Sequence, residues 1–396
     1  MINVQTLKGF RDFLPIDIKK REYVLNTLKK VFETYGFEPL ETPALEYEEI
    51  LTGKYGDEGD KLMYKFKDLG DRNVALRYDQ TVPLARVIAQ YQNELPLPFK
   101  RYQIQNVWRA ENTQKGRYRE FLQVDADIVG TYSPLADAEI LSLIYQSYSS
   151  LGLKIKIIVN DRKQLSSIEN KYLMSIDKVG KISEQEIIKE LESKGMSVEE
   201  AEKTFNKIKS MPKPDNISTV ESIFKKMGNP EDTLEYVPVL VRGLDYYTGL
   251  IFEVLVKNQE YTLSLGGGGR YDNLIGIFAG RDIPAVGFSF GFDRLIEAME
   301  ELDLFPKNLG TKNVLVAFSS PDLQEKALEI TIKLRDKEVN AEYYLEDASL
   351  EKQLKYADKK AITYVIIVNE NDFIFKDMEK RTQENLSLDN IIKKLK

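Results

Sequence analysis

The chain has 396 residues, of which 42% are hydrophobic and 30% charged, and a formal net charge of −7, which is ordinary for a globular protein. It contains no cysteine and no histidine, which excludes disulfides, thiolate and imidazole metal sites, and every Ser-His or Cys-His nucleophile. No apolar run is long enough to span a bilayer and no apolar leader follows Met1, so we expect a cytosolic protein of two or three domains.

A helix and a short strand are predicted near the start of the chain. Apolar residues recur at helical spacing between Ile18 and Tyr35, and Gly36 ends the run. The extended segment that follows, FEPLETPALE, contains Pro43, which favours the edge of a sheet. An ordinary surface helix is equally compatible with the first part of this pattern.

Asp79 and Thr81 form the next pair of interest. They lie two residues apart, so on an extended backbone their side chains point the same way. As isolated residues they could also cap a helix that begins near Val82.

The stretch from Arg101 to Gly130 predicts an antiparallel hairpin, because polar and apolar residues alternate along both of its halves. The polar positions that share faces are Gln103, Gln105, Arg109 and Glu111 on the first strand, and Phe121, Gln123, Asp125 and Asp127 on the second. A solvated sheet face would explain the alternation alone. However, a ring lies among the polar residues, and residues 100–119 carry six Lys/Arg and one acid. These features favour a flat, anionic, aminated ligand such as ATP beside an amino acid.

A helix at 136–151 and a strand at 154–160 follow the hairpin. From about residue 162 to 235, lysine, glutamate and serine dominate, with helical stretches expected at 184–194 and 198–211. We interpret this part as a small helical insertion, and no chemistry is readable in it.

The third part of the chain returns to strands. An apolar strand is predicted at Tyr236–Val241, followed by RGLDYYTG, which begins at Arg242. LIFEVLV and YTLSL are predicted to pair, joined through Lys257–Glu260. The glycines of GGGGRYD indicate phosphate binding only weakly, because such runs are more often turns. Beside a strand and with Arg270, they would let a ligand lie flat on the sheet.

A strand at 285–291 then leads into a helix whose first turn carries Arg294. After residue 310, strands at 314–318, 341–344 and 364–368 alternate with helices at 323–337 and 349–360, which predicts a mostly parallel sheet. This segment has 15 Lys/Arg against 16 Asp/Glu, so charge alone does not establish RNA binding.

Several of these motifs resemble the histidyl-tRNA synthetases, which belong to class IIa of the aminoacyl-tRNA synthetases. WRAE followed by GRYREF is similar to motif 2 of class II, while RGLDYYTG and GGGGRYD are similar to segments peculiar to the histidyl enzymes. The first helix and strand resemble motif 1, and the strand and helix around Arg294 resemble motif 3. The resemblance covers nearly the whole chain. It implies an α+β catalytic domain over 1–308, with an antiparallel sheet flanked by helices and the insertion at 162–235, and an anticodon-binding-like α/β domain over 311–396.

The resemblance also implies an activity. The enzyme would activate histidine with ATP to histidyl-adenylate, release pyrophosphate, and transfer the histidyl group to the 3′ end of tRNA(His). It implies a cytoplasmic homodimer, paired through motif 1, with no membrane association. Since thiolates and imidazoles are absent, the expected metal is Mg²⁺, held mainly by phosphates. The C-terminal domain could alternatively serve only dimer packing.

By position in the motifs, the resemblance assigns roles to individual residues. For ATP, Arg109 would hold the α-phosphate, Glu111 the adenine amine, Arg117 the tail phosphates, and Arg294 the adenine and γ-phosphate, with Phe121 stacking on the adenine. For histidine, the implied residues are Asp79, Thr81 and Gln123 at the ammonium, Asp127 and Tyr247 at the ring, Arg242 at the carboxylate, and Tyr246 in the same site. Arg109 and Arg242 would be catalytic. Core packing would explain one of the two tyrosines.

Arg242 would follow its strand and lie at the floor of the sheet, contacting both anions. A structural salt bridge to Asp245 is the alternative. For the whole chain, the alternative is a non-catalytic paralogue like the regulatory subunit of histidine biosynthesis. Such paralogues erode RGLDYYTG and lack the C-terminal domain, and this chain keeps both.

Overall fold

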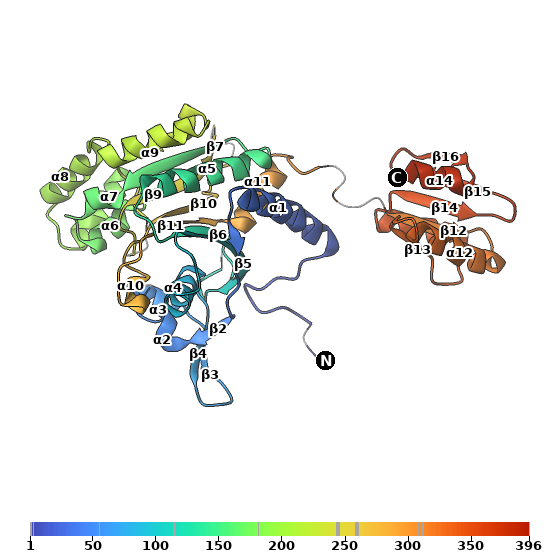
Figure 1. Ribbon diagram of the computed structural model, residues 1–396, viewed down its shortest axis with the longest axis horizontal. Coiled ribbons are helices and arrows are strands. Elements are labelled where there is room, and N and C mark those ends of the chain that lie inside the picture. The colour runs from blue at the N-terminus through green and yellow to red at the C-terminus, as the bar shows by residue number, and fades with distance from the viewer. Residues whose placement is uncertain are drawn as a thin grey trace. The chain divides into compact units, whose positions relative to one another are not determined.

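The computed structural model describes residues 2, 4–54, 56–113, 116–180, 182–242, 246–257, 261–306, 309 and 313–395. The chain forms two compact units, Met1–Phe305 and Pro306–Lys396 (Figure 1). Each unit has its own sheet and its own hydrophobic core. Among the described residues, no helix has the length and apolar character needed to cross a membrane.

The first unit is built on a sheet that has eight strands within the described ranges, in the order β1-β5-β6-β11-β10-β9-β7-β8. Their bounds are β1 Glu38–Pro39, β5 Phe99–Trp108, β6 Glu120–Val129, β7 Ile155–Asp161, β8 Leu234–Tyr236, β9 Leu250–Val256, β10 Gly266–Arg270 and β11 Ala285–Phe290. The inner strands pair antiparallel, whereas β1 and β8 join the two edges in parallel. The expected hairpin is β5–β6, and the mainly antiparallel sheet confirms the α+β fold class.

Four helices cover one face of this sheet (Figure 1). They are α1 Pro15–Thr34, α5 Pro134–Ser150, α9 Asp215–Lys226 and α11 Phe292–Glu301. The apolar row of β6, Val124, Ala126 and Ile128, packs into this core, as the alternation predicted. The polar row of β6 therefore faces the other side of the sheet, where the candidate site lies.

A second layer borders that polar side. It consists of the short sheet β2-β4-β3 and four short helices. The bounds are β2 Leu45–Tyr47, β3 Lys65–Lys67, β4 Asn73–Leu76, α2 Glu48–Leu51, α3 Gly56–Lys61, α4 Thr81–Gln90 and α10 Gly276–Ala279. A small core that includes Val82, Leu84 and Ile275 joins α4 to α10.

The helical insertion is shorter than expected. Its helices α6 Asn170–Ile176, α7 Glu184–Ser193 and α8 Val198–Lys209 bury small cores of their own. Ser197 and Glu200 form a capping box at the start of α8. By contrast, α9 contributes Ile217, Val220 and Phe224 to the main core, and β8 extends the main sheet. These later elements therefore belong to the catalytic fold.

Two predicted strands were wrong. YTLSL is not a strand; the glycine run itself forms β10, with Gly266 opposite Val254 of β9 and Phe290 of β11. Only glycine fits there, because a Cβ on Gly268 would overlap the carbonyl of Gly287 on the next strand. The strand expected at 236–241 ends at Tyr236, and the chain then turns, with Leu240 donating its N–H to the carbonyl of Val237.

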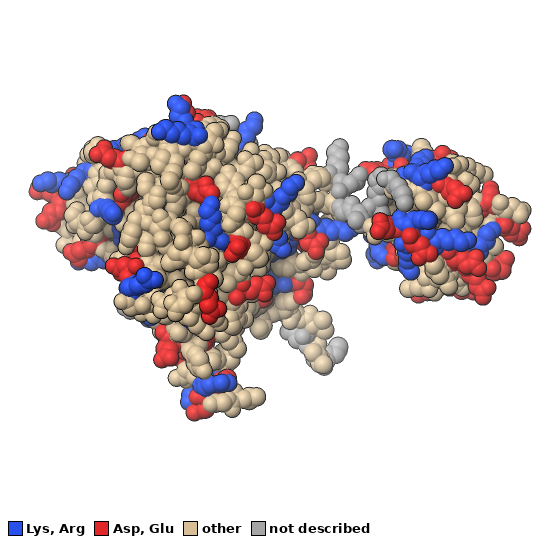
Figure 2. Space-filling view, in the orientation of Figure 1, with Lys and Arg blue, Asp and Glu red and all other residues tan. Residues whose placement is uncertain are grey.

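The second unit holds a five-stranded sheet within residues 313–395, in the order β13-β12-β14-β15-β16. Its elements are β12 Val314–Phe318, α12 Gln324–Arg335, β13 Ala341–Tyr343, α13 Leu350–Lys359, β14 Tyr364–Val368, β15 Phe373–Asp377, β16 Thr382–Asn385 and α14 Leu388–Leu395. The predicted parallel strands β13, β12 and β14 are confirmed, but β15 and β16 add an antiparallel hairpin. On the face drawn in Figure 2, acidic and basic side chains of this unit are intermixed.

Candidate active site

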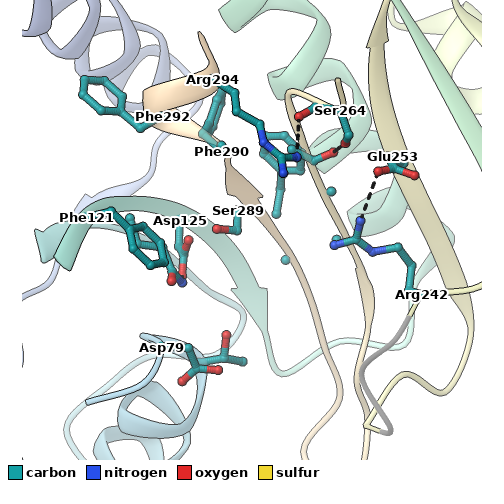
Figure 3. Close-up of a pocket in the computed structure, with 18 of the residues that line it drawn as sticks. Asp79, Phe121, Asp125, Arg242, Glu253, Ser264, Ser289, Phe290, Phe292 and Arg294 are labelled. Atoms are coloured by element: carbon teal, nitrogen blue, oxygen red, sulfur yellow. Dashed lines mark hydrogen bonds and ion pairs between the residues drawn. The ribbon is translucent and has the colours of Figure 1, made fainter. Parts of the chain in front are cut away.

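A cavity of approximately 500 Å³ lies on the polar side of the main sheet (Figure 3). All the site residues predicted from the sequence line it: Asp79, Thr81, Arg109, Glu111, Arg117, Phe121, Gln123, Asp127, Arg242, Tyr246, Tyr247 and Arg294. They come from β6, the loop between β5 and β6, the start of α4, the segment before β9 and the first turn of α11. Residues far apart in the sequence are therefore brought to one cavity.

The floor of the cavity carries no side chains. It is formed by Gly266, Gly267 and Gly268 of β10, with Gly287 of β11 beside them. We call these four residues the glycine floor. A Cβ on Gly267 would lie 2.5 Å from Nη1 of Arg242, and one on Gly287 would overlap the carboxylate of Asp127. The absence of side chains is therefore what allows Arg242 and Asp127 to lie where they do.

Arg109 and Phe121 form one wall. Arg109 donates from Nε to the carbonyl of Tyr78 at 3.1 Å, and its guanidinium lies 5.2 Å from the Phe121 ring centroid and 4.5 Å from that of Tyr78. Burial raises the pKa of the Tyr78 hydroxyl, so this ring is neutral at physiological pH. The wall combines a fixed guanidinium with an aromatic face, which suits a phosphate joined to a purine.

The two other predicted phosphate ligands lie nearer the mouth. Arg117 is exposed and lies 3.8 Å from a carboxylate oxygen of Glu111, a distance at which the pair is loosely held. Arg294 donates from Nη1 to the carbonyl of Ser264 at 3.1 Å. Neighbouring Asp293 accepts from Arg11 and Arg21, each at 2.7 Å, and so ties the start of α11 to the N-terminal segment.

Asp79 caps a helix and also lines the cavity. Its Oδ1 accepts from the backbone N–H of Val82 at 3.1 Å, which caps the first turn of α4. The same carboxylate lines the cavity together with Thr81. Capping and ligand binding are therefore compatible, since a carboxylate has more than one acceptor site.

Asp127 is more heavily engaged than its expected role required. One of its oxygens lies 2.7 Å from Nη2 of Arg101, whose side chain is fully buried, and the other accepts from the hydroxyl of Tyr271. Burial raises the pKa of Asp127, while Arg101 opposes this rise. An N–H group of a bound ligand would therefore share the Asp127 carboxylate with Arg101 and Tyr271.

Tyr247 belongs to a small buried core with Leu240 and Ile251, as core packing of one tyrosine would require, and Tyr246 packs against it; both also line the cavity. Their ring centroids lie 4.9 Å apart, and that of Tyr246 is 5.8 Å from Tyr271. Burial raises the pKa of all three hydroxyls. They are neutral hydrogen-bonding groups at physiological pH.

Arg242 reaches the glycine floor from a turn, because the strand expected before it ends at Tyr236. Its Nη1 lies 3.7 Å from a carboxylate oxygen of Glu253 on β9 (Figure 3). Burial lowers the pKa of Arg242, but Tyr247, Glu253 and Asp177 raise it above its ordinary value overall, so the group is always charged. The suggested partner Asp245 lies outside the described residues.

Sequence reasoning gave no role to several polar residues that also line the cavity, among them Asp125, Asp177, Glu253, Ser289 and Tyr271. Two of them had a signal. Asp125 follows the alternation of β6, and Tyr271 stands within the quoted glycine motif. Asp177 had none, because it lies in the insertion, where the sequence shows no motif. Arg270, by contrast, does not line the cavity; it pairs with Asp137 at 3.0 Å.

The chain matches the sequence profile of the family described as histidyl-tRNA synthetase over residues 9–171 and 160–295. Residues 313–396 match the anticodon binding domain. A histidine–tRNA ligase of Christiangramia forsetii is 37% identical over 453 residues, covering 98% of each chain. The crystal structure of histidyl-tRNA synthetase from Nostoc sp. PCC 7120 has a TM-score of 0.83 at 29% identity, covering 100% of this chain and 99% of that one.

One further neighbour shows the fold alone. A structure described as an ATP phosphoribosyltransferase regulatory subunit/histidyl-tRNA synthetase from Bacillus halodurans has a TM-score of 0.75 at 21% identity, over 92% of this chain and 98% of that one. Both family profiles and the full-length likeness agree with the motifs found in the sequence. This chain belongs to the histidyl-tRNA synthetase family.

Proposed function

We propose that this protein is a histidine–tRNA ligase that forms histidyl-adenylate from histidine and ATP and then charges tRNA(His). The observation that carries the proposal is the distribution of charge in the cavity. Arg242 and Arg294 lie on one side of it, and Asp79 and Asp125 lie across from them (Figure 3). A site of this kind suits a phosphate chain at one end and a cationic amino acid at the other.

The chemistry fits a protein without imidazole. The histidine carboxylate attacks the α-phosphorus of ATP, the bond to the β-phosphate oxygen breaks, and pyrophosphate leaves. The attacking carboxylate is already ionised, so no base has to remove a proton from it. Catalysis then depends on holding two anions together and on offsetting the charge that develops, which fixed guanidinium groups can do.

Arg109 and Arg242 are the two groups we assign to this step. Arg109 is held by the carbonyl of Tyr78, and Arg242 lies over the glycine floor near Glu253. In our proposal both contact the α-phosphate, with Arg242 also on the histidine carboxylate. Phe121 and Glu111 would hold the adenine, and Arg117 and Arg294 the outer phosphates.

Mg²⁺ belongs to the proposal through ATP. Within the described ranges, no three Asp or Glu residues are grouped so that they could hold a metal ion. ATP phosphates would therefore supply most ligands of a bound Mg²⁺, which accepts such a shell with several waters. Its contribution would be to neutralise the departing pyrophosphate.

Pyrophosphate exchange tests the activity. The purified chain should exchange labelled pyrophosphate into ATP only when histidine is present, and it should charge tRNA(His). The regulatory paralogue, the alternative reading, would bind histidine without exchange. Absence of exchange in a folded protein that binds ATP, or exchange that follows another amino acid, would overturn the proposal.

Replacing Asp127 with asparagine should weaken histidine binding far more than ATP binding. The substitution removes the charge opposite Arg101 and a strong acceptor for a ring N–H, worth on the order of 1.5–3 kcal/mol. Calorimetry with histidine and with ATP measures both affinities. Unchanged histidine affinity would show that the ring lies elsewhere.

A homodimer is also part of the proposal, and so is a cytoplasmic location, because tRNA charging serves translation. The β2-β4-β3 sheet leaves Leu45, Tyr47 and Phe66 about half exposed, and Leu69 fully so. Exposed apolar side chains grouped on one small sheet are typical of a subunit interface.

Sedimentation equilibrium should therefore give twice the monomer mass of 45.6 kDa. Replacing Leu45 and Phe66 with glutamate should shift the protein toward monomer and reduce exchange. A wild-type monomer with full activity would contradict both the interface and the assignment of motif 1.

A further inference from the structure

Asp125 and Asp127 stand two residues apart on the cavity face of β6 and are 2% and 3% exposed. Arg101 interacts electrostatically with both carboxyls, but its ion pair is with Asp127. It lies 2.7 Å from Asp127, whose other oxygen accepts from Tyr271. Asp127 therefore has a partner for each oxygen, while Asp125 lacks a counter-ion of its own.

The partners of Asp125 leave one of its oxygens open. Oδ2 accepts from Nε2 of Gln123 at 2.7 Å. Oδ1 is buried and has no hydrogen bond of normal geometry, although the Ser289 hydroxyl opposite it acts on the carboxyl and lowers its pKa. The amide oxygen of Gln123 is also buried without a hydrogen bond. Asp125 and Gln123 both line the cavity, so two buried acceptors stand together on its wall. Buried acceptors left without donors are costly, which indicates that a ligand supplies the missing donors.

The strand neighbours of Asp125 are uncharged. The residues in register with it are Gln103 on β5 and Ser289 on β11. The groups that act on it electrostatically from its own sheet are Arg101 and Asp127. Tyr246, the titratable neighbour across the cavity, is influenced by both Asp79 and Asp125, so these two carboxyls flank the same space.

We propose that Asp125 is a specificity-determining residue that acts as the counter-ion of the substrate's α-ammonium group, and that binding of the amino acid drives its proton into solvent. The inference rests on the proposed function. In the balanced step, the O–H bond of the Asp125 carboxyl breaks, the proton passes to buffer, and the carboxylate pairs with the incoming cation. Gln123 orients that carboxylate through Nε2 and presents its own amide oxygen to the same ammonium.

The electrostatics of the empty site support this assignment. Burial raises the pKa of Asp125 to about 7, the charge of Asp127 adds to the rise, and Arg101 opposes it. Near neutral pH the carboxyl is then partly protonated, unlike an exposed aspartate. A cation that arrives within about 4–6 Å lowers such a pKa by 1–3 units, which is enough to ionise the group.

Proton counting by calorimetry tests the inference. Histidine is titrated into the wild-type chain and into Asp125→Asn in buffers of different ionisation enthalpy. If binding lowers the pKa of Asp125 by about 2–3 units, the wild-type chain should release more protons than the variant, by most of one at about pH 5.5, about one half at pH 7, and almost none at pH 9. The affinity of the wild type relative to the variant should also rise roughly tenfold per pH unit below the pKa of Asp125.

Two analogues identify the responsible group without any mutation. Histidinol keeps the ammonium and the ring, whereas imidazolepropionate keeps the ring and carboxylate but lacks the ammonium. With the wild-type chain, the release assigned to Asp125 should occur with histidinol and be absent with imidazolepropionate. The comparison of the two analogues uses only the wild-type chain, so it tests the inference even if Asp125→Asn does not fold.

Asp137→Asn is the matched control. Asp137 is another buried carboxyl, with a pKa raised by burial to about 6, but it pairs with Arg270 and does not line the cavity. This variant should release as many protons as the wild type. Equal proton counts for wild type and Asp125→Asn, or a loss in Asp137→Asn as well, would overturn the inference. If the wild-type chain bound no histidine, the proposed function itself would fail instead.

Discussion

Replacing Arg242 with lysine should slow histidyl-adenylate formation by roughly 10²-fold or more, the scale for losing one preorganised donor. The fold and ATP binding should remain nearly intact. A planar guanidinium can contact two oxygens of different groups at once, whereas an ammonium is a single point of charge on a flexible stem. The change therefore removes the contact that spans both anions and keeps the net charge of the cavity.

The geometry separates this prediction from a structural role. The guanidinium of Arg242 lies 3.7 Å from a carboxylate oxygen of Glu253 and against the glycine floor. So loose an ion pair contributes little to stability. Rapid-quench measurement of adenylate formation, with a thermal melt alongside, distinguishes the two roles. A lowered melting temperature with nearly normal chemistry would assign Arg242 to structure.

Arg270→Lys provides the comparison. Arg270 is buried and donates to Asp137 at 3.0 Å and to the carbonyl of Thr131 at 3.0 Å, but it does not line the cavity. Loss of these bonds should lower the melting temperature, because lysine cannot replace a fork of donors. Arg270→Lys should therefore lower the melting temperature without slowing adenylate formation. This is the opposite of the result expected for Arg242→Lys.

Deleting the chain from residue 311 onward should spare histidine-dependent pyrophosphate exchange but reduce tRNA charging by roughly 10²-fold or more, the scale for losing one of two linked binding modules. Every residue that lines the cavity lies within the first unit, which has its own core. The second unit matches the anticodon binding domain.

The measurements for the deletion are exchange and charging with the same protein, with circular dichroism to show that the first unit is folded. Undiminished kcat/KM for tRNA(His) in the deleted chain would show that the second unit does not read tRNA. Loss of exchange together with charging would instead indicate that the second unit stabilises the catalytic one, as dimer packing would.

Elements with strong local patterns could be predicted from the sequence. The helix α1, the hairpin β5–β6 and the pair β11–α11 all follow apolar spacing that depends only on neighbours along the chain. The same alternation placed Gln123 and Asp127 on the cavity face. It also contained Asp125, whose importance depends on a missing counter-ion that no spacing reveals.

The remainder depends on tertiary neighbours. The glycines of β10 have low strand propensity, yet they pair with β9 and β11 on either side. These positions require glycine because the neighbouring residues leave no room for a side chain. Helix α9 has the composition of the insertion, yet it packs on the main core. Asp177 reaches the cavity through the placement of a whole subdomain, which a polar sequence does not encode in any local pattern.

The glycine floor also has an evolutionary consequence. Every single-base change in a glycine codon that changes the residue adds at least a Cβ, and at Gly267 that atom would displace Arg242, while at Gly287 it would displace Asp127. Single-base changes that replace either glycine therefore disturb a neighbouring residue of the site. New amino-acid specificities, whether selected in nature or sought in the laboratory, have to arise from the walls of the cavity, where side chains can be exchanged one for another.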